Sequence, residues 1–311
     1  MSFVKKAILP GWWSDDIALT QAGYAQALML LSRNLKIDIH LLLLEDAPLE
    51  IHSLLPVLNK SPQGMAAEKL RWAQSLGERM AEIALQGTGD SHPLPKSASA
   101  MRDTLDANNH PPHLESVLDL CWKLGVPVLY LNENPTGACK PHAMIFRSQG
   151  RYSVVLSRKL IYSSMMAFDL LHEIGHAVMG HLTNNCSIVD KTIELTEEER
   201  EEEANRFAVE VLTGNPDLQF TSNRWFNAER LAVSARSIGS QFHIDPGVIA
   251  LNYAWHNKRY FPMAQNALSL LEPNADAVGT IRRYMRDRLD WNKLTEENEE
   301  YLLCMSGAME E

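Results

Sequence analysis

The chain has 311 residues, of which 45% are hydrophobic and 22% charged, a composition typical of a folded globular protein with one large or two ordinary domains. Its formal net charge of −10 argues against a general nucleic-acid coat, although it leaves room for a local basic face. The 4 cysteines have neither the density nor the close spacing of a disulfide scaffold or a C-x-x-C zinc site. No apolar run approaches the roughly 18 residues of a transmembrane helix, and no signal-peptide core follows the N-terminus. We therefore expect a cytosolic protein without a membrane partner.

Residues 1–90 are predicted to form a helical N-terminal region. The stretch 20–38 resembles a helix-turn-helix, but no basic recognition helix accompanies it, so we interpret it as a degenerate motif that packs rather than reads DNA. A longer helix is expected from Ser61 or Pro62 to Leu85. The following stretch is rich in glycine, proline and small polar residues, which is typical of a linker and places a domain boundary there.

Residues 97–214 are predicted to mix helices and strands. The pattern indicates two helices followed by a strand, at 98–105, 114–124 and 126–131. Two more segments, 143–147 and 151–156, flank Gly150, which can adopt the positive φ of a tight turn, so they are predicted to pair as a hairpin. We expect this small sheet to offer an edge strand with which an extended peptide substrate can pair.

An H-E-x-x-H sequence runs from His172 to His176 within an apolar helical stretch. At about 100° per residue, positions four apart share a face, so His172 and His176 can bind one ion. Glu173 points about 100° away from His172, where its carboxylate suits a base acting on water rather than a ligand. This division of roles favours a hydrolytic zinc site over a helix with two incidental histidines.

The sequence around this motif supports a packed helix. Ser163 and Ser164 are candidates to cap its N-terminus, and Gly175 allows another backbone to come close. His181 follows His176 after four residues, without the spacing or the glycine turn of the third ligand in metzincins. We therefore expect His181 to be a hydrogen-bonded or solvated histidine at the helix end.

A third ligand is expected on a downstream helix, which begins at Thr196 with a capping-box sequence. Helical phase places Glu201 within the apolar stripe of this helix and Glu203 on its flank. Because a carboxylate on a buried stripe is unfavourable unless it meets a cation, Glu201 is the preferred ligand and Glu203 the alternative. Asn205, one turn after Glu201, is expected to hydrogen-bond it.

The H-E-I-G-H motif from His172 to His176, together with E-E-E-A-N-R-F-A from Glu201 to Ala208, resembles the ImmA/IrrE family of zinc metallopeptidases. The resemblance covers residues 97–214 and implies an α+β fold. A small zincin-like domain, with three or so strands and the H-E-x-x-H helix, would lie between helical N- and C-terminal regions. It also implies Zn²⁺ as the cofactor, His172, His176 and Glu201 as its ligands, and Glu173 as the general base.

The same resemblance implies a biological role. Members of this family are typically intracellular proteases that cleave a partner repressor of the helix-turn-helix type and so derepress stress or defence genes. In parts of the family, activation is tied to DNA damage, sometimes through single-stranded DNA.

A closer resemblance is to the CapP-type members that accompany bacterial defence operons, in which a cysteine thiolate is thought to bind the zinc until activation. Cys139 precedes the predicted hairpin, from where its thiol can reach the open coordination position as an inhibitory ligand. A plain free cysteine is the alternative. His142 and Tyr152 are candidates to steady the tetrahedral oxyanion, although structural roles explain both residues as well.

Residues 215–311 are predicted to be all helical. One helix should bury Leu231, Ala235, Ile238 and Phe242, another begins at Pro246, and others are expected at 263–272, 276–290 and 295–305. The arginines and lysines of this region, with aromatic residues interspersed among them, suit the binding of single-stranded nucleic acid. Solvated helix faces and core aromatics explain the same residues, and we prefer that interpretation.

The sequence therefore predicts a cytosolic zinc endopeptidase whose substrate is a small helix-turn-helix repressor, with single-stranded DNA as a candidate activator. The alternative is a non-proteolytic regulatory module that binds a repressor or single-stranded DNA. Glu173 favours the enzyme, because a purely structural zinc site has no use for a carboxylate beside an open position.

Overall fold

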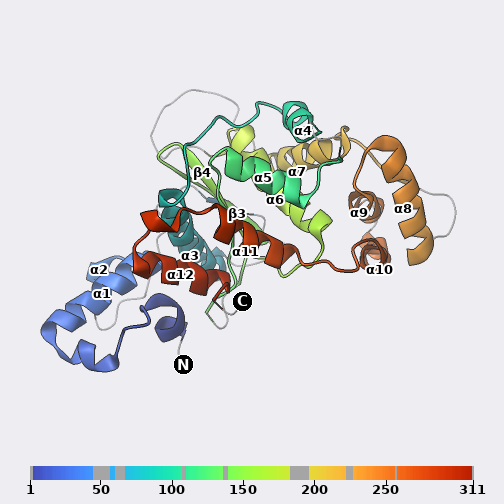
Figure 1. The fold of residues 1–311 in the computed structure, drawn as a ribbon. Helices are drawn as coiled ribbons and strands as arrows, with labels where there is room; N and C mark the ends of the chain where they lie inside the picture. Colours follow the sequence, from blue (N-terminus) through green and yellow to red (C-terminus); the bar gives the residue numbers. More distant parts are fainter. Residues whose placement is uncertain are drawn as a thin grey trace.

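The computed structural model describes residues 3–44, 57–59, 67–106, 110–135, 139–182, 196–221, 227–255 and 258–309 (Figure 1). Helices account for most of these residues, and a small mixed sheet lies among them. This architecture confirms the α+β class, with helical regions on both sides of the central domain in the sequence. No helix among the described residues is both long and apolar enough to cross a membrane.

The N-terminal region begins with two single-turn helices, η1 (Val4–Ile8) and η2 (Asp15–Leu19), followed by α1 (Gln21–Leu35) and α2 (Ile39–Leu42). The Thr20 hydroxyl accepts a hydrogen bond from the Gly23 amide and caps α1. Helix α2 has only 4 residues, which is too short to serve as a recognition helix. The helix expected to start at Ser61 or Pro62 is α3 (Ala67–Gln86); the expected start lies outside the described residues.

The sheet has four strands in the order β1-β3-β4-β2, rather than about three. Strands β3 (Ala143–Ser148) and β4 (Arg151–Leu156) form the predicted antiparallel hairpin, and Gly150 has a φ of 80° in its turn. Strand β2 (Val128–Tyr130) runs parallel to β4. The strand that the sequence did not predict is β1 (Val57–Asn59), which pairs antiparallel with β3.

Both faces of this sheet are covered by helices. Successive side chains of a strand point to opposite faces, so Val154 and Leu156 enter one apolar cluster while Val155 enters another. Helices α4 (Ala98–Asp106), α5 (Leu114–Lys123), α6 (Ser163–Val178) and α7 (Glu197–Thr213) contribute to the first cluster. Helix α3 contributes to the second, together with α12 (Glu296–Ser306), and lies on the opposite side of the sheet (Figure 1). Burial on both faces explains why these strands are continuously apolar.

Helices α6 and α7 form an antiparallel pair, because His172 meets Asn205 whereas His176 meets Glu201. A Cβ atom at Gly175 would lie 3.3 Å from the Ala204 Cα, so the close backbone approach predicted for this glycine is confirmed.

The N-terminus of α6 is capped from a distance. The residue before the helix is Tyr162, which makes no side-chain cap, so the expected capping by Ser163 or Ser164 is wrong. Instead the Glu272 carboxylate accepts hydrogen bonds from the Ser163 amide at 2.6 Å and the Ser164 hydroxyl at 2.7 Å. A negative group at this end also suits the helix dipole. Burial raises the pKa of Glu272 above its ordinary value.

The C-terminal region is helical, as predicted. Its elements are α8 (Ala228–Phe242), α9 (Pro246–Trp255), η3 (Lys258–Tyr260), α10 (Phe261–Leu271), α11 (Ala277–Arg288), η4 (Trp291–Lys293) and α12. Helices α8, α9 and α10 pack on one another around Leu231, Ala250 and Leu268 (Figure 1). Leu231 and Ala235 are buried as expected, but Phe242 is 57% exposed because it lies at the last residue of α8.

The domain boundaries at 1–90, 97–214 and 215–311 stay predictions. The packing nevertheless connects the three regions. Helix α3 of the N-terminal region and α12 of the C-terminal region both pack on the sheet, whose β3–β4 hairpin belongs to the central region. Gly77 of α3 faces the sheet so directly that a Cβ there would lie 3.0 Å from the Phe146 ring.

Candidate metal centre

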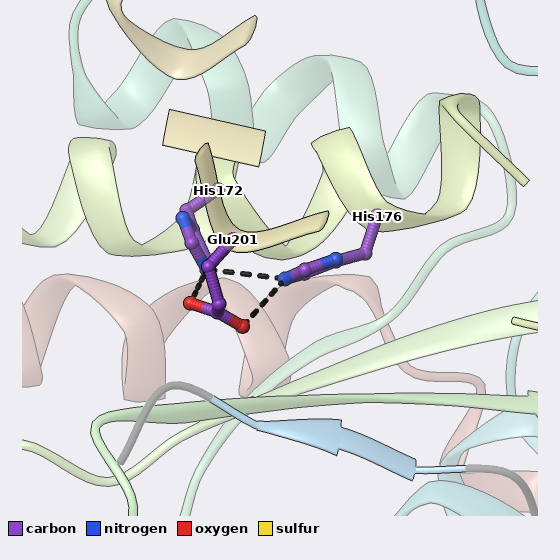
Figure 2. A group of neighbouring side chains, drawn as sticks. All are labelled: His172, His176 and Glu201. Atoms are coloured by element: carbon purple, nitrogen blue, oxygen red, sulfur yellow. Dashed lines mark hydrogen bonds and ion pairs between the residues drawn. The ribbon is translucent and has the colours of Figure 1, made fainter. Parts of the chain in front are cut away.

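The two motif histidines lie one turn apart on α6 and are fully buried. Their Nε2 atoms are 3.2 Å apart, and their ring planes are inclined at 85° (Figure 2). The helical spacing of four residues thus brings both imidazoles to one point, as the sequence predicted.

Glu201 reaches the same point from α7. Its Oε2 atom lies 3.3 Å from the His172 Nε2 atom, and its Oε1 atom lies 3.4 Å from the His176 Nε2 atom (Figure 2). With metal–ligand bonds of about 2.0–2.1 Å, ligand atoms at the corners of a tetrahedron are about 3.3–3.4 Å apart. The spacing of the three groups therefore fits a tetrahedral ion, and His172, His176 and Glu201 can hold a metal.

The hydrogen-bond partner of His172 sets its tautomer. The Nδ1 atom lies 3.0 Å from the Asn205 amide oxygen, so the Nδ1–H group donates and Nε2 keeps its lone pair for an ion. Asn205 was expected to bind Glu201, and that expectation is wrong. Because α7 runs antiparallel to α6, the residue one turn after Glu201 lies beside the earlier histidine of the motif.

His176 is oriented through a chain of two further side chains. Its Nδ1 atom lies 2.9 Å from the His181 Nδ1 atom, and the His181 Nε2 atom lies 2.9 Å from the Glu203 carboxylate. Glu203 can only accept, so His181 carries its proton on Nε2 and accepts the Nδ1–H of His176. This arrangement again leaves the His176 Nε2 lone pair directed at the cluster.

The end of α6 explains how His181 reaches His176. Gly180 has a φ of 75°, the His181 amide donates to the His176 carbonyl at 2.9 Å, and the Gly180 amide donates to the Ala177 carbonyl at 3.2 Å. These bonds form a Schellman motif, which turns the chain back over the last helical turn. The expectation of a hydrogen-bonded His181 is confirmed, but its contact with His176 was missed. The glycine one residue before His181 is the signal that pointed to it.

Glu201 and Glu203 therefore take different positions. Burial favours a higher pKa for Glu201, but the proximity of the His172 and His176 rings outweighs it and lowers the pKa to about 2. Glu201 is thus an anion at neutral pH, which suits a metal ligand. Burial lowers the pKa of His181, although its hydrogen bond to Glu203 acts in the opposite direction. The lowered pKa keeps the His181 ring neutral.

The remaining predicted site residues occupy several places. Glu173 is fully buried on the turn of α6 that carries the histidines. Cys139 is a half-buried free thiol. Among the described residues, the cluster that could hold a metal consists of His172, His176 and Glu201, without Cys139. His142 lines a cavity beside α6, and Tyr152 lies on β4 with the Arg147 guanidinium 5.6 Å from its ring centre.

The sheet edge differs from what was expected. Strand β3 was predicted to offer a free edge to an extended substrate, but β1 pairs with it, with Leu58 opposite Ile145. Strand β1 also contacts α6. At this side of the sheet a substrate backbone can therefore pair with β1, or with β3 after β1 has left it. The sequence could not show this, because β1 and β3 lie far apart in the chain.

Several basic residues of the C-terminal region have structural contacts. Arg282 donates to the Ser306 carbonyl at 2.8 Å, and Arg288 lies 2.6 Å from Asp119. Arg224 and Trp225, a basic and an aromatic residue of this region, lie outside the described residues.

The family model of peptidase M78, described as an IrrE N-terminal-like domain, matches residues 121–238. The matched segment contains β2, β3, β4, α6 and α7, and so all three candidate ligands. This part of the chain is an IrrE N-terminal-like domain. The IrrE-like family consists of metal-dependent metallopeptidases, in agreement with the cluster of two histidines and a glutamate. Neither a curated protein nor a solved structure matches the chain.

Proposed function

We propose that the protein is a zinc-dependent endopeptidase in which His172, His176 and Glu201 hold the ion. The observation that carries this proposal is the convergence of three donor groups: the two Nε2 atoms are 3.2 Å apart, and each lies 3.3–3.4 Å from an oxygen of the Glu201 carboxylate. Two imidazoles and one carboxylate are a donor set of catalytic zinc sites, which keep one position open. Asn205 and His181 support the assignment. Each accepts a hydrogen bond from the Nδ1–H group of one ligand histidine, so the Nε2 atoms of His172 and His176 are unprotonated.

Zinc bound at these residues supplies Lewis acidity toward a peptide carbonyl and toward water. Side chains of the protein carry out the proton transfers and stabilise the developing charge. The Glu173 carboxylate takes a proton from the attacking water and returns it to the leaving amine nitrogen. Complete burial of Glu173 keeps bulk water away from this proton transfer. His142 is a candidate to donate a hydrogen bond to the carbonyl oxygen as its charge develops.

The substrate that we propose is a small helix-turn-helix repressor, whose cleavage derepresses stress or defence genes after DNA damage. The membership of residues 121–238 in the IrrE-like family supports this choice. Single-stranded DNA is the candidate activator of this cleavage.

The decisive experiment mixes the zinc-loaded protein with the helix-turn-helix protein encoded by a neighbouring gene, with and without single-stranded DNA. Glu173→Gln is the matched control, because it removes the base but leaves the three proposed ligands in place. We expect one defined cut with the wild type and none with Glu173→Gln, at equal zinc content. An intact partner in all reactions would contradict the protease proposal, and stable binding without cleavage would favour the regulatory module.

We also propose that Cys139 restrains the site as an inhibitory zinc ligand. The ammonium group of the neighbouring Lys140 donates to the carbonyls of Leu131 and Asn132. Cys139→Ala is expected to raise the basal cleavage rate, because the thiolate no longer competes with water for the open position. A basal rate equal to that of the wild type would exclude this restraint.

A further inference from the structure

A cavity of about 230 Å³ lies beside the candidate metal centre, between α6, α7 and α9. Most of its wall is apolar, and it includes Phe168 of α6, Val209 of α7, and Leu251 and Trp255 of α9. For comparison, an apolar cavity of about 150 Å³ in another protein binds benzene. The present cavity therefore has room for a large hydrocarbon group.

The helices that carry the candidate ligands also form this cavity. Phe168 lies one turn before His172, and the two rings are 6.4 Å apart. On its other side, the Phe168 ring is 5.4 Å from that of Trp255. Val209 lies two turns beyond Glu201 on α7. The cavity thus begins about one helical turn from the metal cluster.

The polar groups in the cavity do not call for a charged occupant. Arg158 lies 3.5 Å from the Asp169 carboxylate, which is 1% exposed. Each charge of this pair is compensated by the other, so an incoming ion would have to separate them. An uncharged apolar group, in contrast, gains from leaving water and displaces none of these contacts.

We infer that this cavity is the subsite for a large apolar side chain, such as leucine or phenylalanine, of the residue next to the scissile peptide bond. The inference rests on the proposed peptidase function. Neighbouring residues of an extended peptide are about 3.3–3.4 Å apart, so a peptide whose carbonyl lies at the cluster places an adjacent side chain within reach of Phe168. The subsite selects hydrophobic residues at that one position.

The first test needs no peptidase activity. Binding of N-acetyl-leucinamide, N-acetyl-phenylalaninamide and N-acetyl-glycinamide is followed by saturation-transfer NMR. The leucine and phenylalanine amides are expected to bind and the glycine amide is not. Val209→Trp should abolish binding by filling the cavity, whereas Val233→Trp, at a 63% exposed position on α8, should preserve it. Leu251→Trp fills the cavity from α9 and replaces Val209→Trp if that variant does not fold.

Equal binding of all three amides, or wild-type binding by a folded cavity-filling variant, would overturn the inference. The second test treats a random peptide mixture with the zinc-loaded protein and sequences the new ends. A preference of roughly tenfold or more for apolar residues is expected at one position beside the cut, and Val209→Trp should shift it toward small residues. Cleavage without this preference refutes the subsite, whereas no cleavage together with intact amide binding refutes the peptidase function alone.

Discussion

His176 can offer Nε2 to a metal only while its proton is on Nδ1, and His181 accepts that proton at 2.9 Å. The Glu203 carboxylate accepts a hydrogen bond from His181 in turn. Glu203, the alternative ligand in the sequence analysis, is therefore separated from the metal cluster by two hydrogen bonds. Partners of this kind orient metal-binding histidines and raise their affinity for the ion.

His181→Phe removes this acceptor and leaves the His176 Nδ1–H group without it. Zinc affinity should fall about 10- to 100-fold. Glu203→Gln should cause a smaller loss, because its amide oxygen still accepts from His181. Affinity is measured by competition with a chelator, and Glu202→Gln on the exposed side of α7 is the control. Wild-type affinity in His181→Phe would show that His176 keeps its orientation without this chain.

Among the elements, the contact between α6 and α7 decides whether the three ligands meet. A Cβ at Gly175 would lie 3.2 Å from the Phe207 Cβ and 3.3 Å from the Ala204 Cα, closer than side chains normally pack. Helix propensity favours alanine over glycine by about 1 kcal/mol, whereas overpacking costs about 1–3 kcal/mol.

Gly175→Ala is therefore expected to lower the free energy of unfolding by roughly 1 kcal/mol, because crowding outweighs propensity. Zinc affinity should also fall, since α7 must move away from the histidines. Urea denaturation and chelator competition measure the two effects. A more stable Gly175→Ala protein would mean that the helices adjust without loss.

The cap of α6 makes a second prediction at this scale. Burial raises the pKa of Glu272, so the folded protein retains this proton at pH values where the unfolded chain, with a pKa of 4.5, has lost it. The contribution of Glu272 to stability is thus greatest below the unfolded pKa and declines as the pH rises through the folded pKa.

In Glu272→Gln the side chain does not titrate, so its contribution to stability does not decline as the pH rises. Its amide oxygen can still accept a hydrogen bond from Ser163 or Ser164. Relative to the wild type, the variant should gain stability between about pH 4 and about pH 7. Urea midpoints at the two pH values provide the measurement. A constant difference between the proteins would indicate that Glu272 titrates normally.

In the molecule as a whole, Arg79 of α3 joins regions from the two ends of the chain. Its guanidinium donates to Asn298 of α12 at 2.7 Å and to Asn34 of α1 at 3.2 Å, and all three residues are buried. Burial lowers the pKa of Arg79. These bonds hold the N-terminal helices and α12 together on one face of the sheet.

Arg79→Met should lower the free energy of unfolding by about 2–4 kcal/mol, because it leaves buried amide groups without their donor. Arg71→Met, on the exposed side of the same helix, should have little effect. Urea unfolding of both variants tests this difference. Equal stability of the two would show that water replaces the Arg79 contacts.

Local signals in the sequence determined much of this protein. The spacing of His172 and His176 placed both on one helix face, and Thr196 caps α7 with Glu199 as its capping box predicted. The hairpin around Gly150 and the C-terminal helices followed from turn residues and periodicity. These features depend on groups within a few residues of each other, so the sequence contains their physical causes.

Only the tertiary structure decided which distant groups meet. The antiparallel packing of α6 and α7 assigns Asn205 to His172, Glu203 to His181 and Glu201 to the cluster. The pairing of β1 with β3 and the capping of α6 by Glu272 also join distant segments. Such contacts arise from how whole elements pack, because periodicity defines the face of a helix or strand but not the partner that covers it.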